Sequence, residues 1–497
     1  MLAHKRLIIA CDGTWLNSND GFDRDSWMPW NTGEKLVVSS NVTRICRALL
    51  PDSQDGIQQI VYYQSGVASQ GSLWSWLGGF VGAGIGENIR EAYAFLCNNY
   101  DEGDEISLIG FSRGAFIARS IAGLISSIGI LTKHGLGAFY PIFKDWENQN
   151  VSNYKPQLQT RSWPLKGRPV FKDADKAYWE RLKACKLTRP TIPPIKAVGV
   201  FDTAGSLGVP TIKILGFQLH THSTSEYAFT NTEVPLNVEH AYQALALDER
   251  RTPFSPPVWE TPADGSGAIL KQLKQTWFPG VHKGVGGGYA DTSSADITLA
   301  WMITQLSPFL DFDTSYISRQ REQNVDFYEE YEPPINPVLS WGLGLLVPSD
   351  SGIDATITGR TVRTPGEYHA TDPDMGATLR RRLVKTCEFI HPSVRYRIEQ
   401  KGAAVAKNTN DYVDMGKTVY QPDALKGWEF VKDNDADDIG GKEWQGRNKW
   451  VDKRPAGEGA YIVEDVIEDG TAEMELLRGW AGIEVTLRQD GQVSGQR

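Results

Sequence analysis

Gly110-Phe111-Ser112-Arg113-Gly114 is a serine bracketed by glycines, a G-x-S-x-G sequence. It follows the apolar run 105–111 and opens the apolar run 113–130, so we expect a strand, a sharp turn and a buried helix. This context strains the serine backbone and projects its hydroxyl, as a nucleophile requires. The N–H of Arg113, at the positive end of the helix, would face a developing oxyanion. The alternative is a tight turn whose serine has no chemical part.

A nucleophilic hydroxyl needs a base, and His282 is the candidate among the eight histidines. It leaves a predicted strand and enters a Gly-rich loop, as a base beside a cleft should. The alternative is a loop histidine that only caps a turn. His240 falls inside a predicted helix, where a packed histidine is the simpler interpretation. His220 and His222 could share a metal on one face of a strand, but no carboxylate or cysteine has ligand spacing to them.

The acid that orients such a base should end a strand between Ser112 and His282. Asp202 closes the apolar run 195–201 and meets this requirement. A lone carboxylate there needs a partner, which the His282 imidazole would supply. The alternative is an Asx-turn that caps the next residues. Asp248 is the second candidate, although it follows a predicted helix.

A second oxyanion donor must come from a loop after an early strand. The apolar run 7–11 ends in Asp12-Gly13-Thr14, so we expect the backbone N–H of Gly13 or Thr14 to fill this role. Asp12 could hold the loop through turn hydrogen bonds, or act as a cap with no catalytic part.

The elements that would position these residues are short apolar runs without alternation, which are typical of strands buried on both faces of a parallel sheet. Strands are predicted at 7–11, 60–63, 105–111, 195–201 and 273–278. Helices are predicted at 89–100, 113–130, 237–247 and 295–306. This alternation indicates an α/β fold with a mostly parallel central sheet and helices on both faces. Beyond about residue 310 the pattern fades.

Composition restricts the classes of partner and compartment. Lysine plus arginine is 51 and aspartate plus glutamate is 61, a net charge of −10, which argues against a nucleic-acid partner. The five cysteines are scattered without a CxxC, which favours reduced thiols in an intracellular protein. The N-terminal apolar run is too short for a signal peptide, and no stretch of about 18 apolar residues occurs. We expect a soluble, cytoplasmic protein; its oligomeric state stays open.

Several segments of the chain, taken together, resemble a known family. The chain is similar to the α/β-hydrolase domain family that contains the phospholipase effectors of bacterial type VI secretion, with fungal and bacterial members of unassigned function. The resemblance covers about residues 5–400 and is carried by these blocks: IIACDGTW (8–15), VYYQSGV (61–67), LIGFSRGAFIARSIAGLI (108–125), VGVFDTAGSLG (198–208), HAYQALALDERRTPF (240–254), WFPGVHKGVGGGY (277–289), ADITLAWM (295–302) and EFIHPSVRYR (388–397). Carried over by position, the family's triad falls on Ser112, Asp202 and His282.

The sequence departs from the family pattern beside the triad histidine. Such families usually have a serine and then an aspartate directly after it, where this chain has Lys283 and Gly284. Leu16 also stands where the family's first motif usually has an asparagine. Substrate preference is therefore not carried over with the triad.

The resemblance implies an α/β-hydrolase-like fold with insertions and a C-terminal accessory region. We expect a catalytic core over 1–310, a C-terminal part of the family domain over 311–400, and an accessory region over 401–497. The expected function is ester hydrolysis through an acyl-enzyme, with a lipid as substrate and no metal or organic cofactor. The alternatives are an esterase for small soluble esters and a non-catalytic scaffold that binds a partner.

Two groups of residues would hold a lipid substrate. Arg250, Lys283 or Arg113 could contact a phosphate. Trp74 and Trp76 lie in a Gly/Trp-rich stretch that could form a lid or touch a membrane surface. The apolar residues 209–217 could do the same, and a packed insertion over the cleft explains both stretches equally well.

Overall fold

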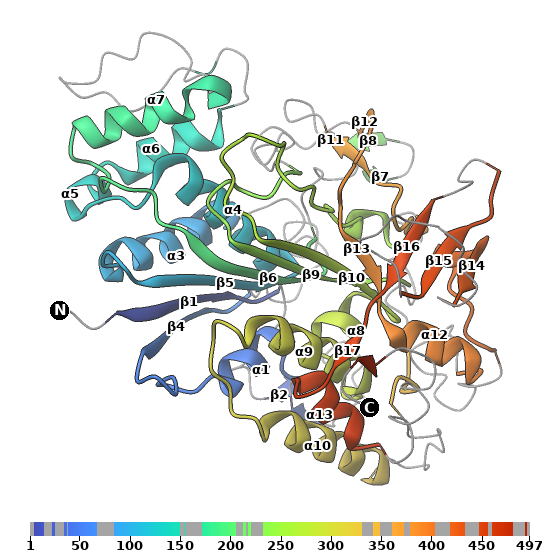
Figure 1. The fold of residues 1–497 in the computed structure, drawn as a ribbon. Coiled ribbons are helices and arrows are strands. Elements are labelled where there is room, and N and C mark those ends of the chain that lie inside the picture. The colour runs from blue at the N-terminus through green and yellow to red at the C-terminus, as the bar shows by residue number, and fades with distance from the viewer. Residues whose placement is uncertain are drawn as a thin grey trace.

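The chain is described here from a computed structural model, which describes residues 4–13, 22–24, 34–36, 38–66, 84–149, 154, 171–204, 212–214, 217–219, 232–330, 341–347, 360–371, 378–402, 418–432, 447–455, 460–480 and 493–494. A ten-stranded sheet runs through the middle of the molecule (Figure 1). Its strands, in spatial order, are β14 (Trp428–Val431), β15 (Lys449–Asp452), β16 (Tyr461–Glu464), β13 (Glu388–Ile390), β10 (Gln272–Phe278), β9 (His240–Ala246), β6 (Ile195–Phe201), β5 (Glu105–Phe111), β1 (Lys5–Cys11) and β4 (Gln58–Gln64).

The strands from β4 to β16 pair in parallel, and only β15 runs against its two neighbours. The central strands are apolar on both sides: β1 is buried from Leu7 to Cys11, and β5 from Ile106 to Phe111. Such runs fit a parallel sheet with both faces covered. The predicted α/β fold class with a mostly parallel sheet is confirmed.

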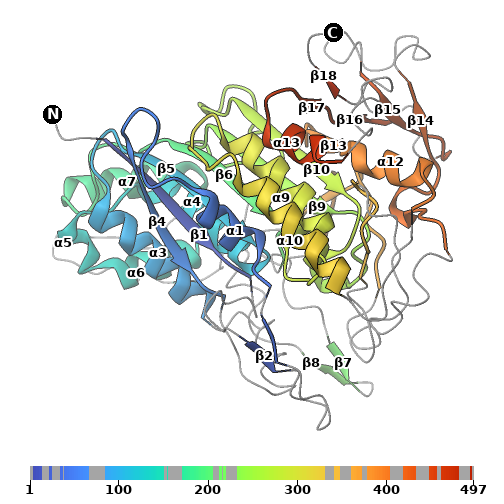
Figure 2. The same cartoon turned by 90° about the horizontal axis from the view of Figure 1, so that it is seen from below.

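Helices cover both faces of the sheet (Figures 1 and 2). One core cluster joins the sheet to α3 (Ile85–Asn99), α4 (Arg113–Ile128), α6 (Phe139–Glu147) and α7 (Phe171–Ala184). The other face packs on α1 (Asn41–Ala48), α9 (Ser293–Leu306), α10 (Tyr316–Glu330) and α13 (Ala472–Arg478). α4 is apolar nearly all round because β1, β5, β6, α3 and α7 surround it.

Short elements connect these layers. The helices are α5 (Lys133–Leu136), α8 (His282–Gly286), α12 (Pro392–Glu399), and the 3-10 turns η1 (Thr252–Phe254) and η3 (Asp423–Leu425). The two-stranded pairs are β2 (Phe22–Arg24) with β3 (Glu34–Leu36), β7 (Ile212–Ile214) with β8 (Phe217–Leu219), β11 (His369–Thr371) with β12 (Thr378–Arg382), and β17 (Ile467–Glu468) with β18 (Val493–Ser494).

One predicted helix is wrong. Residues 237–247 were expected to be helical, but His240–Ala246 forms β9, a central strand between β6 and β10. Its HAYQALA sequence is rich in helix-forming alanine and leucine, yet every residue from Ala241 to Ala246 is buried. Pairing and burial on both sides therefore override a weak local preference.

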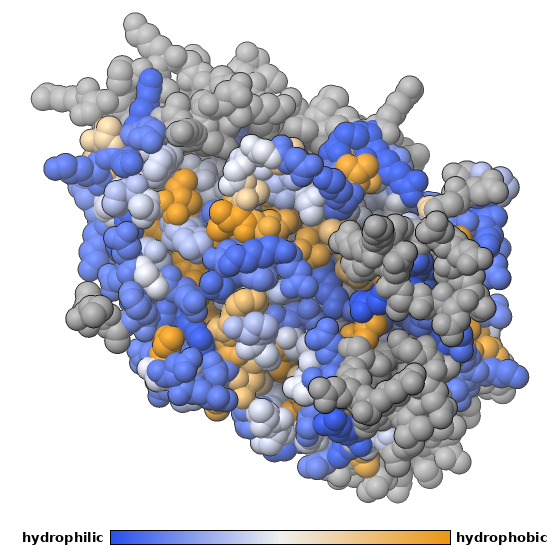
Figure 3. Space-filling view, in the orientation of Figure 1, coloured by the Kyte–Doolittle hydropathy of each residue, from blue (hydrophilic) through white to orange (hydrophobic). Residues whose placement is uncertain are grey.

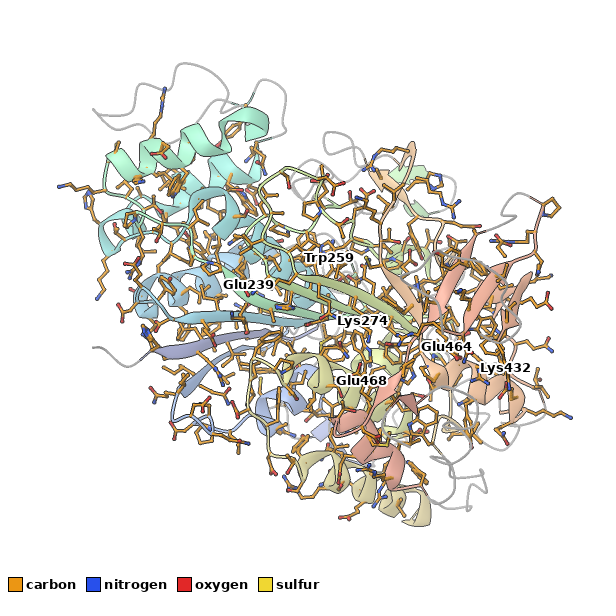
Figure 4. The ribbon with its side chains drawn as sticks, viewed as in Figure 1. Glu239, Trp259, Lys274, Lys432, Glu464 and Glu468 are labelled. Carbon is orange, nitrogen blue, oxygen red and sulfur yellow. The ribbon has the colours of Figure 1, made fainter. Side chains whose placement is uncertain are left out.

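The C-terminal residues extend the central sheet. β16 pairs in parallel with β13, and β15 and β14 continue from it as a hairpin-like edge. Two ion pairs hold this junction: Lys274 of β10 contacts Asp465 at 2.8 Å, and Glu464 of β16 accepts from Arg395 of α12 at 3.0 Å (Figure 4). Residues 401–497, expected as an accessory region, thus contribute β14, β15 and β16 to the central sheet, and α13 to the helices that pack on it.

The face of the molecule seen in Figure 3 is mostly hydrophilic, with apolar side chains gathered near its middle. Among the residues that the structure describes, no helix has the length and apolar character to cross a membrane. All five cysteines are free thiols.

Candidate active site

The candidate catalytic residues follow strands that end at one edge of the sheet. Register places Cys11 opposite Gly110, Phe111 opposite Phe201, and Ala246 opposite Phe278. The strand order also reverses here, because β4 lies on one side of β1 while β5 and the later strands lie on the other. Crevices outside the carboxyl ends of strands at such a switch point are where open α/β sheets bind ligands.

Ser112 occupies a strained turn between β5 and α4. Its φ of 56° and ψ of −120° lie in a region that non-glycine residues rarely adopt. The flanking glycines permit the turn: a Cβ on Gly110 would collide with the backbone of Gly114, and one on Gly114 with the carbonyl of Cys11. The serine therefore stands at the N-terminus of α4 without capping it, as a nucleophile elbow does.

Asp202 and His282 are brought together across 80 positions of the chain. Asp202 directly follows β6 and His282 begins α8, and their Oδ2 and Nδ1 atoms lie 2.6 Å apart. Both side chains are buried, with Asp202 at 0% and His282 at 4% exposure. The contact to Nδ1 leaves Nε2 as the ring nitrogen for proton exchange.

Ser112 lies beside this pair. Its N–H donates to the carbonyl of Phe201 at 3.1 Å, one residue before Asp202, and its carbonyl accepts from Ala204 at 3.3 Å. The ring of the preceding residue, Phe111, packs on the His282 imidazole with centroids 4.7 Å apart. The structure thus gathers all three expected triad residues at one end of β5 and β6.

Arg363 also enters this site, and it is not among the residues predicted from the sequence. Its guanidinium donates to Asp202 Oδ1 at 2.7 Å and to Oδ2 at 3.0 Å, and both side chains are almost fully buried. The arginine lies in the segment 360–371, more than 150 positions after the aspartate. No local motif surrounds it, so only the folded chain identifies it.

The charges set the protonation of the pair. Burial alone would raise the pKa of Asp202, but Arg363 and then His282 hold that pKa well below its ordinary value. Burial lowers the pKa of His282, and the contact with Asp202 offsets this only in part. The pair at neutral pH is therefore a carboxylate and a neutral imidazole, the state that a general base requires.

A second carboxylate holds the backbone of His282. Glu249 Oε2 accepts the His282 N–H at 3.2 Å, and the same carboxylate forms a bidentate pair with Arg251 at 2.9 and 3.0 Å. Arg251 in turn lies over the ring of Phe254, and that ring packs against the imidazole at 4.7 Å. The residues 249–254 therefore form one wall around the base.

The loop after β1 approaches Ser112 as expected. A Cβ on Gly13 would lie 3.2 Å from the Cβ of Ser112. However, the N–H of Gly13 donates to Oδ1 of Asp12 at 2.7 Å, so it is already engaged. Thr14, the other expected donor, lies outside the described residues. The N–H of Arg113 stands at the first position of α4.

Asp12 anchors this loop. Its Oδ2 accepts from Ser40 at 2.6 Å, Thr43 at 3.0 Å and Tyr63 at 2.8 Å. Burial raises the pKa of Asp12, while these hydrogen bonds and that of Gly13 work against the rise. A buried acceptor with this many donors fixes the loop, which fits the anchoring interpretation of Asp12.

The expected substrate-binding residues are placed as follows. Arg250 points to Asp423, with which it forms an exposed ion pair at 2.6 Å, while its neighbour Arg251 faces the site. Lys283 lies in the first turn of α8, with its ammonium 5.8 Å from the ring centroid of Tyr289. Trp74 and Trp76 lie outside the described residues, as do His220, His222 and residues 209–211 and 215–216.

Asp248, the second candidate acid, also follows a strand, because residues 240–246 are β9. Its carboxylate accepts from the Gly280 N–H at 2.7 Å and from the Tyr420 hydroxyl at 2.8 Å. The carboxylate that contacts the His282 ring is that of Asp202. Within the described ranges, no group of three His, Cys, Asp or Glu side chains could hold a metal ion.

The fold and this edge of the sheet define an α/β-hydrolase-like chain. Residues 5–305 match the family model for the catalytic domain of Tle1-like phospholipase effectors of type VI secretion. The chain belongs to this family, which confirms the resemblance drawn from the sequence blocks.

Two further proteins are similar to this chain. An uncharacterized protein of Saccharomyces cerevisiae is 28% identical over 268 residues, which is 50% of this chain and 32% of the yeast protein. The chain thus matches about a third of the length of that curated relative. A crystal structure of an uncharacterized protein from Pseudomonas aeruginosa covers 60% of this chain and 45% of its own, with 16% identity and a TM-score of 0.30.

Proposed function

We propose that this chain is a serine hydrolase that cleaves carboxylic esters through an acyl-enzyme, with a lipid ester as its substrate. The observation that carries the proposal is the 2.6 Å contact between Asp202 and His282 beside a serine held at a φ of 56°. Membership of a family of phospholipase effectors supports lipase-like hydrolysis as the reaction class.

In the proposed reaction, Ser112 Oγ attacks the ester carbonyl while His282 Nε2 takes the hydroxyl proton. Collapse of the tetrahedral intermediate breaks the bond to the alcohol, which leaves with the proton from His282. A water molecule then attacks the acyl-serine with His282 again as base, and the carboxylic acid is released. Asp202 holds the imidazole in the required tautomer and stabilises the imidazolium that forms in both steps.

The developing oxyanion needs donors in place before the reaction. The N–H of Arg113 is at the positive end of α4, a helix of 16 residues. The loop that follows Asp12 would supply the second donor, because Gly13 lies directly beside Ser112. Loss of one such donor typically costs about 3 kcal/mol of barrier.

The substrate class follows from the family and from the charges at the site. A phospholipid would require a cation near the cleft for its phosphate. Lys283 directly follows the base and is the candidate, whereas Arg251, although it lies beside His282, is held in a bidentate pair with Glu249. Arg250 is not favoured for this role, because it is engaged with Asp423 on the surface.

The experiment that tests the reaction class is labelling with a fluorophosphonate, which reacts with activated serines. Wild-type protein should label at a single site, and Ser112→Ala should not label while its circular dichroism spectrum stays unchanged. Ser107→Ala, in the buried part of β5, is the matched control and should label as wild type does. Failure of the folded wild-type protein to label would favour a non-catalytic scaffold.

The substrate class needs a separate test with esters of different solubility. Hydrolysis of a short-chain phosphatidylcholine should rise steeply as its concentration passes the micelle threshold, because a lipid site works at an interface. Hydrolysis of p-nitrophenyl acetate should show no such break. Equal or better turnover of the soluble ester, with no break for the phospholipid, would point to a soluble-ester esterase.

A further inference from the structure

We propose that Arg363 is a positioning residue for the Asp202–His282 pair: its guanidinium fixes the carboxylate and offsets part of its charge, which keeps the imidazole unprotonated. This inference rests on the proposed ester hydrolysis and deepens it. It also assigns a site role to a part of the chain beyond residues 5–305, the range that matches the family model.

The geometry of the contact is that of a planar fork on a carboxylate. Nη1 donates to Asp202 Oδ1 at 2.7 Å and Nη2 to Oδ2 at 3.0 Å, while Nη2 also donates to the carbonyl of Phe254 at 2.7 Å. The arginine and aspartate side chains are 3% and 0% exposed. Bidentate pairs of this kind restrict both partners in angle as well as in distance.

These contacts leave the carboxylate little freedom to rotate. Oδ1 accepts from Arg363 and from the N–H of Ala246 at 3.0 Å. Oδ2 accepts from Arg363 and lies 2.6 Å from His282 Nδ1. Rotation of the carboxylate would break hydrogen bonds on both oxygens, so Oδ2 stays directed at the imidazole.

Arg363 also supports the ring that packs on the base. Its contact with the Phe254 carbonyl holds η1, and the Phe254 ring meets the His282 ring edge to face at 4.7 Å. The backbone of the segment that carries the arginine also pairs with residues 249–254. Thr361 N–H donates to the Arg250 carbonyl at 2.8 Å, and Arg360 forms an isolated antiparallel β-bridge with Arg251. One side chain therefore connects the hydrogen-bond partner and the ring partner of His282.

Other charges stand around the pair and must be weighed. The titratable and charged groups on the elements packed against it are Asp12, Arg113, Asp248, Glu249, Arg251, Lys283, Arg360 and Tyr368. Glu249 and Arg251 form their own bidentate pair and act in opposite directions on the pKa of His282. Among the described residues, Arg363 is the cation hydrogen-bonded to Asp202, so its removal leaves that carboxylate without its positive partner.

The sign of the effect is fixed. Without the guanidinium, the Asp202–His282 pair carries an uncompensated negative charge in a buried place, and it binds a proton at a higher pH. The unprotonated base is then lost at a higher pH. The acidic limb of the rate profile should therefore move upward in Arg363→Met, by about one pH unit or more, a tenfold change in proton affinity.

The test compares Arg363→Met with Arg363→Lys and with a matched control. Lysine keeps the charge but loses the fork, so it should leave the acidic limb near that of wild type and lower the maximal rate. Arg381→Met removes an equally bidentate arginine, paired with Glu260 at 2.8 Å for both bonds, from a place outside the site. It should change neither the limb nor the maximal rate of fluorophosphonate labelling.

A histidine titration separates this proposal from the proposed reaction. Protein with ¹³Cε1-labelled histidine is titrated by NMR, and the His282 signal is assigned by its loss in His282→Asn. The midpoint of His282 should rise in Arg363→Met and stay near wild type in Arg363→Lys, whether or not any ester is hydrolysed. An unmoved midpoint in Arg363→Met, or equal shifts in both variants, would overturn the role of Arg363. If wild type shows the expected titrations but neither labels nor hydrolyses esters, the proposed function alone fails.

Discussion

Ser112 and Asp202 end neighbouring parallel strands, and both hold their backbones at positive φ, 56° and 35°. The two turns are bonded to each other, because Ser112 N–H donates to Phe201 and Ala204 N–H donates to Ser112. Residues in such backbone regions cost about 1–3 kcal/mol each and persist only where their surroundings hold them. Strain at both positions fits a site in which the hydroxyl and the carboxylate must face the same imidazole.

Replacing Ser112 separates this strain from the proposed chemistry. Ser112→Ala and Ser112→Gly should both abolish fluorophosphonate labelling, because both remove the hydroxyl. Glycine adopts positive φ without a steric penalty, so Ser112→Gly should be more stable than Ser112→Ala by about 1–2 kcal/mol. Urea denaturation of the two variants measures the difference. Equal stabilities would mean that the turn carries no strain.

The sequence predicts the sheet better than the connections between its strands. Runs such as EISLIGF indicate buried strands because most of their residues are apolar without alternation, and the structure has strands β1, β5, β6 and β10 at these runs. The prediction of a helix at β9 is wrong because alanine and leucine favour helices locally, whereas the burial of this segment is a property of the whole fold. The sequence does not show that β14 to β16 join the central sheet, because their pairing depends on distant partners.

The same limit applies to the site. Ser112, Asp202 and His282 could be proposed from sequence because each follows a recognisable apolar run. Arg363 could not, since it stands in no motif and its partner Asp202 is 161 positions earlier. Glu249 lies in the block 240–254, but nothing in that block shows that its carboxylate would accept from the His282 N–H. The sequence analysis names Arg250 as a substrate-binding residue, but its side chain points to Asp423, and the adjacent Arg251 faces the site. The direction of two neighbouring side chains depends on the fold and cannot be predicted from the sequence.

Two glycines of α8 should respond oppositely to alanine. At Gly284 a Cβ would meet nothing within 4 Å, so Gly284→Ala should raise the free energy of unfolding by about 0.5–1 kcal/mol. At Gly286 a Cβ would collide with the ring of Phe111, which is itself packed on His282. Gly286→Ala should therefore destabilise the chain by about 1–3 kcal/mol and slow labelling of Ser112. Urea denaturation and labelling rates check both; similar behaviour of the two variants would contradict the packing argument.

The loop beside Ser112 should depend on the carboxylate of Asp12 and not only on the size of this side chain. Asp12→Asn replaces one acceptor oxygen by an amide that cannot accept, so either Gly13 or the hydroxyls of Ser40, Thr43 and Tyr63 lose a partner. The loop beside Ser112 should loosen, and kcat for an ester should fall about tenfold to a hundredfold with a smaller change in KM. Tyr63→Phe removes a single donor and should lose far less. An unchanged kcat in Asp12→Asn would show that the loop does not support the reaction.

Asp248 should give the folded chain a pH dependence that is independent of the triad. Burial raises the pKa of Asp248 to about 6, although the Gly280 N–H and the Tyr420 hydroxyl act against the rise. A carboxyl whose pKa is higher in the folded state favours folding when protonated. Its contribution is complete below about pH 4, the pKa of an unfolded aspartate, and is lost as the pH rises through about 6. The free energy of unfolding falls by at most about 3 kcal/mol over this range. Because Asp248 is half-buried, solvent screening makes the fall smaller than this limit.

Asp248→Asn should remove this dependence, since an asparagine oxygen can still accept from Gly280 and Tyr420 but carries no charge. The variant should match wild type near pH 4 and exceed its stability above pH 6, as measured by urea denaturation across this range. Asp423→Asn, in an exposed pair with Arg250, is the control and should keep the wild-type slope between pH 4 and 6. A wild-type slope in Asp248→Asn would place the titration on another group. If Asp248→Asn removes the pH dependence, the titrating group is the carboxylate that accepts from Tyr420. The contact between the end of β9 and the segment before β14 would then depend on pH.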